Sequence, residues 1–163
     1  MFVVANSSVL IALCRIRMLE LLHQRYPEGV FIPKAVWREV VEGGKGQPGA
    51  NEVSSSTWIK VKEVEDRKLV SLLGMELDQG EAEAIVLASE QEADLILLDE
   101  KAARRVAKRL GLAVLGTVGV LIYAKRAGFI GSLKEQLDAL QEEGNFRIAS
   151  DVYNEALRVV SED

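Results

Sequence analysis

The sequence predicts an α/β fold in which a central parallel sheet is covered by helices on both faces. Short apolar runs with the length of buried strands alternate along the chain with segments that have the apolar periodicity of helices. Strands buried on both faces of a parallel sheet are typically apolar along their whole length, as these runs are. No internal repeat or linker-like stretch divides the 163 residues, so we expect a single domain over residues 1–163.

Five segments are expected to form strands: Phe2–Ala5, Gly29–Ile32, Trp58–Val64, Leu95–Leu98 and Ala113–Leu115. Leu95–Leu98 has the strongest signal, because its residues are all apolar and a turn-forming Asp follows them. Trp58–Val64 alternates apolar and charged residues, which indicates an edge strand or the arm of a hairpin.

Helices are expected between these strands. The first covers Val9–Leu22, with a break near Arg15–Arg17, and the second begins at Pro33, since Pro is favoured in the first helical turn. That second helix should end near Glu42, before a flexible Gly-rich loop over residues 43–51. The remaining helices are expected at Arg67–Leu73, Gly80–Gln91, Lys101–Leu110, Val118–Ala127, Leu133–Glu142 and Asp151–Val160.

Composition excludes several classes of protein. The net charge of −5 argues against a general basic nucleic-acid binder, although a local basic patch is compatible with it. With one cysteine, Cys14, and one histidine, His23, the chain has neither an intrachain disulfide nor a His/Cys zinc site. The longest uncharged stretch, Leu110–Ala124, is shorter than a membrane-spanning helix. We therefore expect a cytoplasmic protein that makes no membrane contact.

Polar residues occur at strand ends or on inward faces of helices at four places: Asn6, Glu39, Glu81 and Asp99. Asn6 and Asp99 each follow a predicted strand, and the carboxyl ends of parallel strands lie at the same edge of a sheet. Each residue also has a purely structural interpretation. Asn6, Ser8 and Asp99 are good helix N-caps, Asp78 and Glu81 have capping-box spacing, and Glu39 suits a salt bridge at the rim.

The combination of these four residues suggests chemistry that none of them suggests alone. Carboxylates that converge repel one another, which raises their pKa values, and a hard divalent cation relieves that repulsion. Mg²⁺ prefers oxygen ligands and keeps several waters. Such an ion can orient a phosphodiester and activate a water molecule for attack.

Several segments carry a resemblance to a known family: VVANSSVLIALCRI, FIPKAVWREV, LDQGEAEAIVLASEQEADLILLDEKAARRVAKRLGL, LGTVGVLIYAKRAGFI and FRIASDVYNEAL. In this order they resemble the PIN-domain family of metal-dependent ribonucleases, which includes toxins of prokaryotic toxin–antitoxin pairs, and most closely a prokaryotic subgroup of it. The resemblance covers nearly the whole chain. It implies a three-layer α/β/α fold with a parallel sheet and an acidic cluster that binds Mg²⁺ or Mn²⁺.

Position by position, the resemblance places the acidic cluster of the family on Asn6, Glu39, Glu81 and Asp99, which would be both the catalytic and the metal-binding residues. Ser8 matches the small hydroxyl residue that is usual after the first acid. Most members of the family carry Asp where this chain has Asn6, whereas the subgroup often carries Asn. An Asn retains a carbonyl oxygen but loses a negative charge, so we expect weaker metal affinity.

Candidate RNA contacts lie near these acidic positions. Arg104 matches an Arg favoured in the subgroup and could pair with the acidic cluster or contact phosphate. Thr117 could add a hydroxyl near the site or cap a helix. Other basic side chains, Lys101, Arg105, Lys108 and Arg109, are expected to form a solvated helix face, while Lys34, Arg38 and Lys45 could steer an RNA backbone. Trp37 and Trp58 are expected in the core rather than stacked on bases.

The resemblance implies a metal-dependent endoribonuclease, the toxin of a toxin–antitoxin pair, with an RNA substrate, a small antitoxin partner and a homodimeric assembly. A catalytically weak or inactive PIN-like module that binds RNA or protein is the alternative, and Asn6 motivates it. A phosphoacceptor receiver with a Mg²⁺ pocket ranks last. It requires an acidic pair after the first strand, which Asn6-Ser7-Ser8 does not supply.

Overall fold

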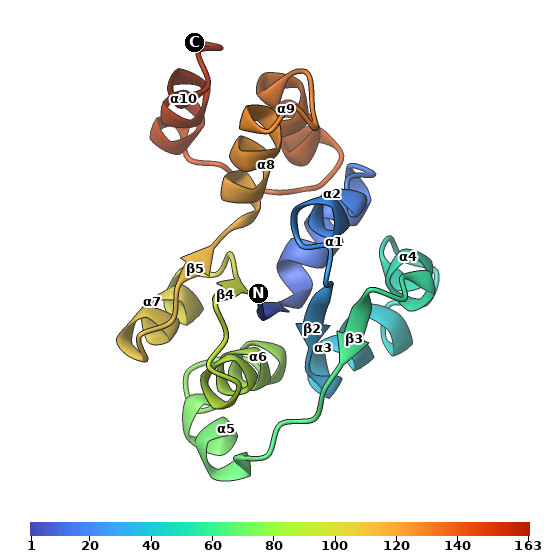
Figure 1. The fold of residues 1–163 in the computed structure, drawn as a ribbon, viewed down its shortest axis with the longest axis vertical. Coiled ribbons are helices and arrows are strands. Elements are labelled where there is room, and N and C mark those ends of the chain that lie inside the picture. The colour runs from blue at the N-terminus through green and yellow to red at the C-terminus, as the bar shows by residue number, and fades with distance from the viewer.

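The computed structural model describes residues 1–163, and its centre is one all-parallel sheet with the strand order β3-β2-β1-β4-β5 (Figure 1). This arrangement confirms the predicted α/β fold. β3 lies at one edge and runs parallel to β2, so the edge-strand alternative is correct and no hairpin forms there. The strands are β1 (Val3–Ala5), β2 (Val30–Ile32), β3 (Ile59–Val61), β4 (Leu95–Leu97) and β5 (Val114–Leu115).

Helices follow or precede every strand, and all those predicted from the sequence are present. None of them combines the length and the apolar character that crossing a membrane requires. They are α1 (Ser7–Arg15), α2 (Glu20–Arg25), α3 (Lys34–Trp37), the π-helix η1 (Arg38–Glu42), α4 (Ala50–Ser55), α5 (Arg67–Leu73), α6 (Gln79–Glu90), α7 (Lys101–Arg109), α8 (Thr117–Arg126), α9 (Leu133–Glu142) and α10 (Ser150–Val159).

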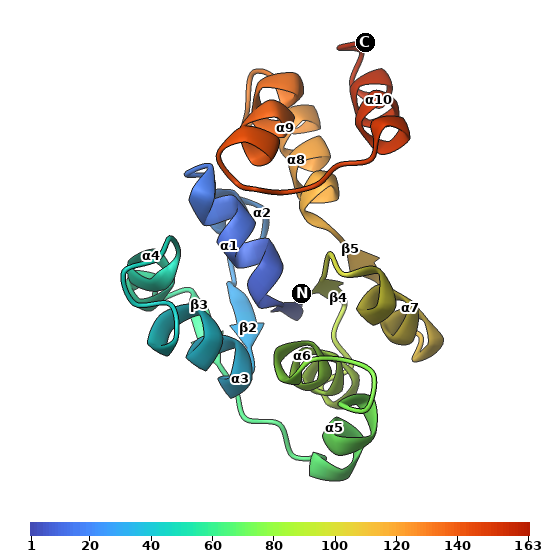
Figure 2. The ribbon, with the colours of Figure 1, turned by 180° about the vertical axis from the view of Figure 1, so that it is seen from behind.

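The alternation of side chains along each strand creates two hydrophobic cores, one on each face of the sheet. Val3 and Ala5 of β1 belong to one core and Val4 to the other. Helices α1, α2, α8 and α9 cover the first face, and α5, α6 and α7 cover the second, as the two opposite views show (Figures 1 and 2). The fold therefore has the three α/β/α layers that the family resemblance implies.

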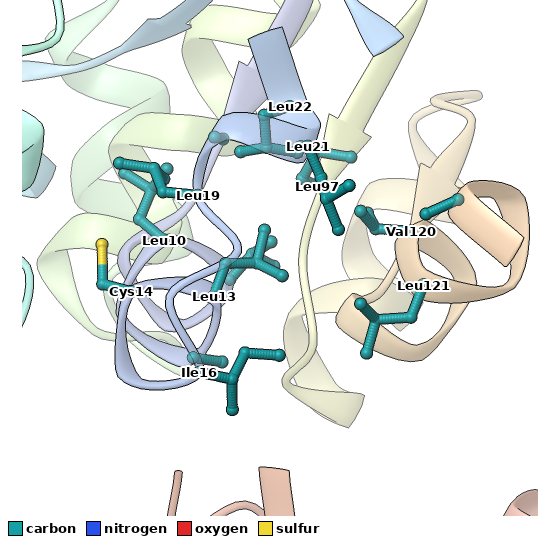
Figure 3. Close-up of a cluster of buried hydrophobic side chains, with 14 of the residues drawn as sticks. Leu10, Leu13, Cys14, Ile16, Leu19, Leu21, Leu22, Leu97, Val120 and Leu121 are labelled. Atoms are coloured by element: carbon teal, nitrogen blue, oxygen red, sulfur yellow. The ribbon is translucent and has the colours of Figure 1, made fainter. Parts of the chain in front are cut away.

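The first core joins the helix that follows β1 to the helix that follows β5. Leu13 of α1 and Leu121 of α8 are both fully buried, and Figure 3 shows them on facing helices beside Leu97 of β4. Burial of each such side chain stabilises the fold by about 1.5–3 kcal/mol. This contact holds the N-terminal ends of α1 and α8 in fixed positions relative to β4.

Other residues predicted to fill the core do so. Cys14 is buried, and burial raises the pKa of its thiol to about 12, so it is an unreactive core side chain. Trp58 is buried, and Trp37 packs against the same core.

The predicted break in the first helix is present. Arg17 has a left-handed backbone with φ of 61°, which ends α1 and turns the chain into α2. The second piece extends three residues beyond the predicted end at Leu22, to Arg25.

The residues around 43–51 were predicted to form only a loop, and this is wrong at its end. Helix α4 begins at Ala50, where Gly49 adopts φ of 106° and donates its N–H to Glu52 at 3.2 Å. This helix is hard to recognise in the sequence because its Ser-rich composition has no apolar periodicity. Tertiary packing of Ala50 and Val53, together with the contact between α4 and η1, explains why it forms.

Candidate functional site

An open cleft of about 640 Å³ lies at the carboxyl end of the sheet. Part of its lining is acidic and polar, and another part is basic. All four residues of the predicted cluster line this cleft, together with the predicted Ser8. The acidic side consists of Asn6, Glu39, Asp78, Glu81, Asp99 and Glu100, with Ser7 and Ser8 beside them. The basic side consists of Arg15 and the segment Gly144–Arg147, which follows α9.

Asn6 holds the N-cap position of α1 but does not cap it. Its backbone is extended, with φ −92° and ψ 161°, and its N–H donates to the Leu97 carbonyl at 3.0 Å. The side chain makes no capping bond, and its Oδ1 atom is buried without any hydrogen-bond partner. The Ser8 hydroxyl likewise has no partner. The capping interpretation of both side chains is therefore wrong.

A buried oxygen with no donor is costly, at about 1–3 kcal/mol. Asn6 is only 3% exposed, so bulk water compensates little of this cost. Native proteins leave few such groups, and these require a ligand, an ordered water or a functional explanation. The unpaired amide oxygen of Asn6 is consequently the strongest sign that the cleft binds something.

Glu39 lies near Asn6, on the far side of the space that a side chain at Gly80 would occupy. Gly80, in the first turn of α6, has no side chain there. A Cβ at Gly80 would lie 2.9 Å from Oε2 of Glu39 and 3.7 Å from Oδ1 of Asn6. Glu39 belongs to the π-helix η1, and π-helical turns are frequent at functional sites. Glu39 as a whole residue is exposed at the rim of the cleft, whereas its carboxyl group is partly buried.

Glu81 has both of the roles that the sequence allowed. It forms the predicted capping box: its N–H donates to Asp78 Oδ1 at 2.8 Å, and its Oε1 accepts the Asp78 N–H at 3.2 Å. It is also buried and lines the cleft. The capping box thus holds a carboxylate that lines the same cleft as Asn6 and Asp99.

Asp99 does not cap α7, contrary to its structural interpretation. Glu100 holds that N-cap position without a side-chain bond. Instead, Asp99 Oδ1 accepts the backbone N–H of Thr117 at 2.7 Å, and Oδ2 accepts the Thr117 hydroxyl at 2.6 Å. Thr117, fully buried at the start of α8, is therefore a direct contact of the acidic cluster.

Arg104 lies beside Asp99. Its Nη1 donates to the Leu98 carbonyl at 3.1 Å, and its positive charge acts to lower the pKa of Asp99. Both side chains occupy the space above Gly116, where a Cβ would lie 2.7 Å from Arg104 Nη1 and 2.8 Å from Asp99 Oδ1. Arg104 therefore acts on Asp99 through its charge, while the one hydrogen bond of its guanidinium goes to the Leu98 carbonyl, so its predicted pairing with the acidic cluster stays a prediction.

The other basic residues singled out in the sequence do not line the cleft. Lys34 pairs with Glu63 at 2.9 Å, and it lines a separate pocket with Arg38 and Arg67. Lys45 is exposed in the loop. The remaining basic residues of α7 are exposed, as expected for a solvated face: Lys101, Arg105, Lys108 and Arg109.

The acidic cluster lacks positive charge. Burial raises the pKa of Asp99, and the hydrogen bonds from Thr117 and the charge of Arg104 offset only part of this effect. Burial also raises the pKa of Glu81, with smaller contributions from the negative charges of Asp78, Glu100 and Glu39. The pKa of Glu39 is raised by burial and by Asp78, against the influence of the Ser7 hydroxyl. All three carboxyls therefore hold a proton more tightly than usual.

The cluster fits a hard cation in the type of its donors, because carboxylate and amide oxygens are what Mg²⁺ and Mn²⁺ prefer. The unpaired Asn6 oxygen and the raised carboxyl pKa values agree with that fit. In the arrangement seen here, however, no three Asp, Glu, His or Cys side chains converge closely enough to hold an ion. A metal site formed by these residues thus requires movement of their side chains.

Sequence reasoning missed one buried carboxylate. Glu83 is 3% exposed, and it accepts the Ala35 N–H at 3.1 Å and pairs with Arg67 at 3.2 Å. It faces away from Glu81 and joins α6 to the start of α3. No apolar or polar pattern could have indicated this, because α6 is buried on nearly all sides. The basic wall of the cleft was missed as well, since its residues are distant in sequence from the acidic positions.

A family model described as a PIN domain matches residues 2–162. Among curated proteins, none matches the chain.

The close approach of Asp99 and Arg104 to Gly116 leads to a test. Gly116→Ala places a Cβ against both polar atoms, so we expect it to lower the free energy of unfolding by about 1–3 kcal/mol, measured by urea denaturation. Gly131→Ala is the matched control, because nothing lies within 4 Å of its new Cβ. Equal stability of the two variants would contradict the packing described around Asp99.

The raised pKa of Glu39 predicts a dependence of stability on pH. A carboxyl whose pKa is higher in the folded state makes its full contribution below its unfolded-state pKa and loses it as the pH rises through the folded value. The free energy of unfolding of the metal-free parent should therefore fall as the pH rises above about 4, the ordinary pKa of a carboxyl group. We expect a smaller fall in Glu39→Gln, because this variant lacks the titrating carboxyl. Urea denaturation at a series of pH values measures this. Parallel curves for the variant and the parent would rule out the raised pKa.

Proposed function

The chain belongs to the PIN-domain family, whose members are commonly nucleases, and from this premise we propose that it is a metal-dependent endoribonuclease that hydrolyses RNA phosphodiesters in the acidic cleft. One observation carries the proposal: the buried Oδ1 of Asn6 has no donor and lines the same cleft as three carboxyls with raised pKa values. Such a site is short of positive charge in a cleft that several oxygen donors line.

The side chains differ in how firmly they are held. Asp99 is fixed by two hydrogen bonds from Thr117, and Glu81 is fixed by the capping box with Asp78. These two would be the more firmly held ligands of Mg²⁺ or Mn²⁺. Glu39 would be a third carboxylate ligand, at the rim of the cleft. Asn6 would contribute a neutral oxygen to the metal, either directly or through a water molecule.

A bound Mg²⁺ or Mn²⁺ would neutralise the cluster, orient a phosphodiester and lower the pKa of the attacking water. The protein's own groups have supporting tasks. Thr117 holds the Asp99 carboxylate in place, Ser8 offers an unused hydroxyl to substrate or water, and Arg104 limits the negative potential beside Asp99. Burial of the cluster strengthens each of these electrostatic interactions.

The biological role rests on the family resemblance alone. On that basis we propose a cytoplasmic toxin that is neutralised by a small antitoxin protein and that forms a homodimer. Growth arrest upon expression, relieved by co-expression of a neighbouring small reading frame, would support the toxin role.

A second function is favoured by specific observations. Asn6 replaces an expected carboxylate, and no three acidic side chains converge in the structure. Both features agree with a PIN-like module of weak or absent activity that binds RNA or protein. Failure of the protein to bind Mn²⁺ at millimolar concentrations would favour this module over the nuclease.

Asp99→Asn tests the proposed chemistry directly. We expect it to abolish Mn²⁺-dependent cleavage of single-stranded RNA, because it removes a charge from the cluster. The fold should survive, since an amide oxygen still accepts the Thr117 N–H and the amide nitrogen can donate to its hydroxyl. Cleavage is followed on gels, and circular dichroism checks the fold.

The matched control for this variant is Glu76→Gln, which neutralises an exposed carboxylate outside the cleft. It should cleave as the parent does. Undiminished cleavage by Asp99→Asn would refute the assignment.

Asn6→Asp tests the role of the unpaired oxygen. We expect stronger Mn²⁺ binding by titration calorimetry, because the substitution restores a charge at a position that already faces the cluster. If Mn²⁺ affinity is unchanged, residue 6 is not a ligand.

A further inference from the structure

The lining of the cleft includes two arginines, Arg15 and Arg147, that the proposed chemistry does not use. We propose that Arg147, held by a segment that Arg15 anchors, binds a backbone phosphate of single-stranded RNA next to the acidic cluster. This inference rests on the proposed function, because it names how that cleft would hold its substrate.

The segment that carries Arg147 has a defined backbone. Phe146 donates its N–H to the Leu140 carbonyl at 3.0 Å, and Arg15 Nη1 donates to the Gly144 carbonyl at 2.9 Å. At Gly144 a Cβ would lie 2.7 Å from the Leu140 oxygen, so only glycine fits there. Asn145 adopts the left-handed φ of 51°, which turns the chain toward the cleft. In Figure 2 this connection between α9 and α10 passes close to the end of α1 that carries Arg15.

Arg147 is free to bind a ligand. Its side chain is exposed and lines the cleft, and no hydrogen bond or salt bridge engages its guanidinium. Other exposed arginines either have a partner, as Arg67 has Glu83 and Arg158 has Glu155, or lie outside the cleft. Those outside the cleft without a partner are Arg17, Arg38, Arg105 and Arg109. Arg15 contacts a neutral carbonyl rather than a carboxylate, so its charge also remains uncompensated. A guanidinium with free donors matches the geometry of a phosphate.

Acidic and basic side chains line the same cleft, and this combination suits RNA, a polyanion that must approach an acidic cluster. With a net charge of −5, the chain as a whole repels RNA, and the cluster repels it locally. Arg147 and Arg15 supply attraction within the cleft itself, so that a neighbouring phosphate can be held while another faces the acids. A volume of about 640 Å³ is that of a small-molecule site and admits a short stretch of single strand rather than a duplex.

The test measures RNA binding without cleavage. A fluorescein-labelled single-stranded RNA oligonucleotide is titrated with the full chain in EDTA, at several salt concentrations, and its anisotropy is recorded. For Arg147→Ala we expect affinity about fivefold weaker at 0.1 M salt and a slope of log K against log salt that is smaller by about 0.7, the value for one phosphate contact with a single strand. Arg147→Lys should retain the slope, because it keeps the charge.

Two controls separate binding from structure. Arg109→Ala removes an exposed arginine outside the cleft and should bind RNA as the parent does. Mn²⁺ affinity by titration calorimetry should be equal in Arg147→Ala and the parent, because Arg147 is not a metal ligand. If Arg147 had only a structural role, the slope of log K against log salt would not decrease in Arg147→Ala and return to the parental value in Arg147→Lys.

The outcomes distinguish this inference from the proposed function. If the parent cleaves RNA while Arg147→Ala keeps the parental affinity and slope, the inference is overturned and the nuclease assignment stands. If the parent binds RNA through Arg147 but never cleaves it, the catalytic proposal fails and the RNA-binding inference stands. Absence of RNA binding by the parent overturns the inference and favours a protein ligand.

Discussion

The parallel pairing of β1 with β4 is the constraint on which the rest of the site depends. Val3, Val4 and Ala5 lie opposite Leu95, Ile96 and Leu97, and the pairing continues through the Asn6 N–H to the Leu97 carbonyl. Because the two strands end together, Asn6 and Asp99 are placed at the same edge of the sheet. A slip of one residue would turn the side chains of β1 to the opposite face and remove Asn6 from the cleft.

The helices that follow these strands add the remaining side chains. The leucine contact between α1 and α8 brings Thr117 to Asp99, and the capping box at the start of α6 directs Glu81 into the same cleft. Local motifs that stabilise helices therefore also orient the acidic side chains. Thr117 is an example, since its backbone and hydroxyl both donate to Asp99 while it begins α8.

The cluster is assembled at an electrostatic cost. Three carboxyls have raised pKa values, one amide oxygen is buried without a donor, and the nearest cation, Arg104, is shared with a backbone carbonyl. Proteins tolerate such unfavourable groupings chiefly where function needs them. The two hydrophobic cores, one on each face of the sheet, stabilise the fold and so offset this cost.

The sequence by itself determined the order of the elements apart from α4, the parallel sheet and the edge where polar residues gather, because these follow from apolar periodicity and from the residues that end each strand. It also indicated the Asp78–Glu81 box, which is a local interaction. Only the tertiary structure decided how each polar atom is used. Asn6 leaves its oxygen unpaired and Asp99 bonds to Thr117 instead of capping α7, because those partners depend on distant segments coming together. The basic wall at Arg15 and Arg147 is likewise a product of packing, since residues far apart in sequence meet there without any local pattern.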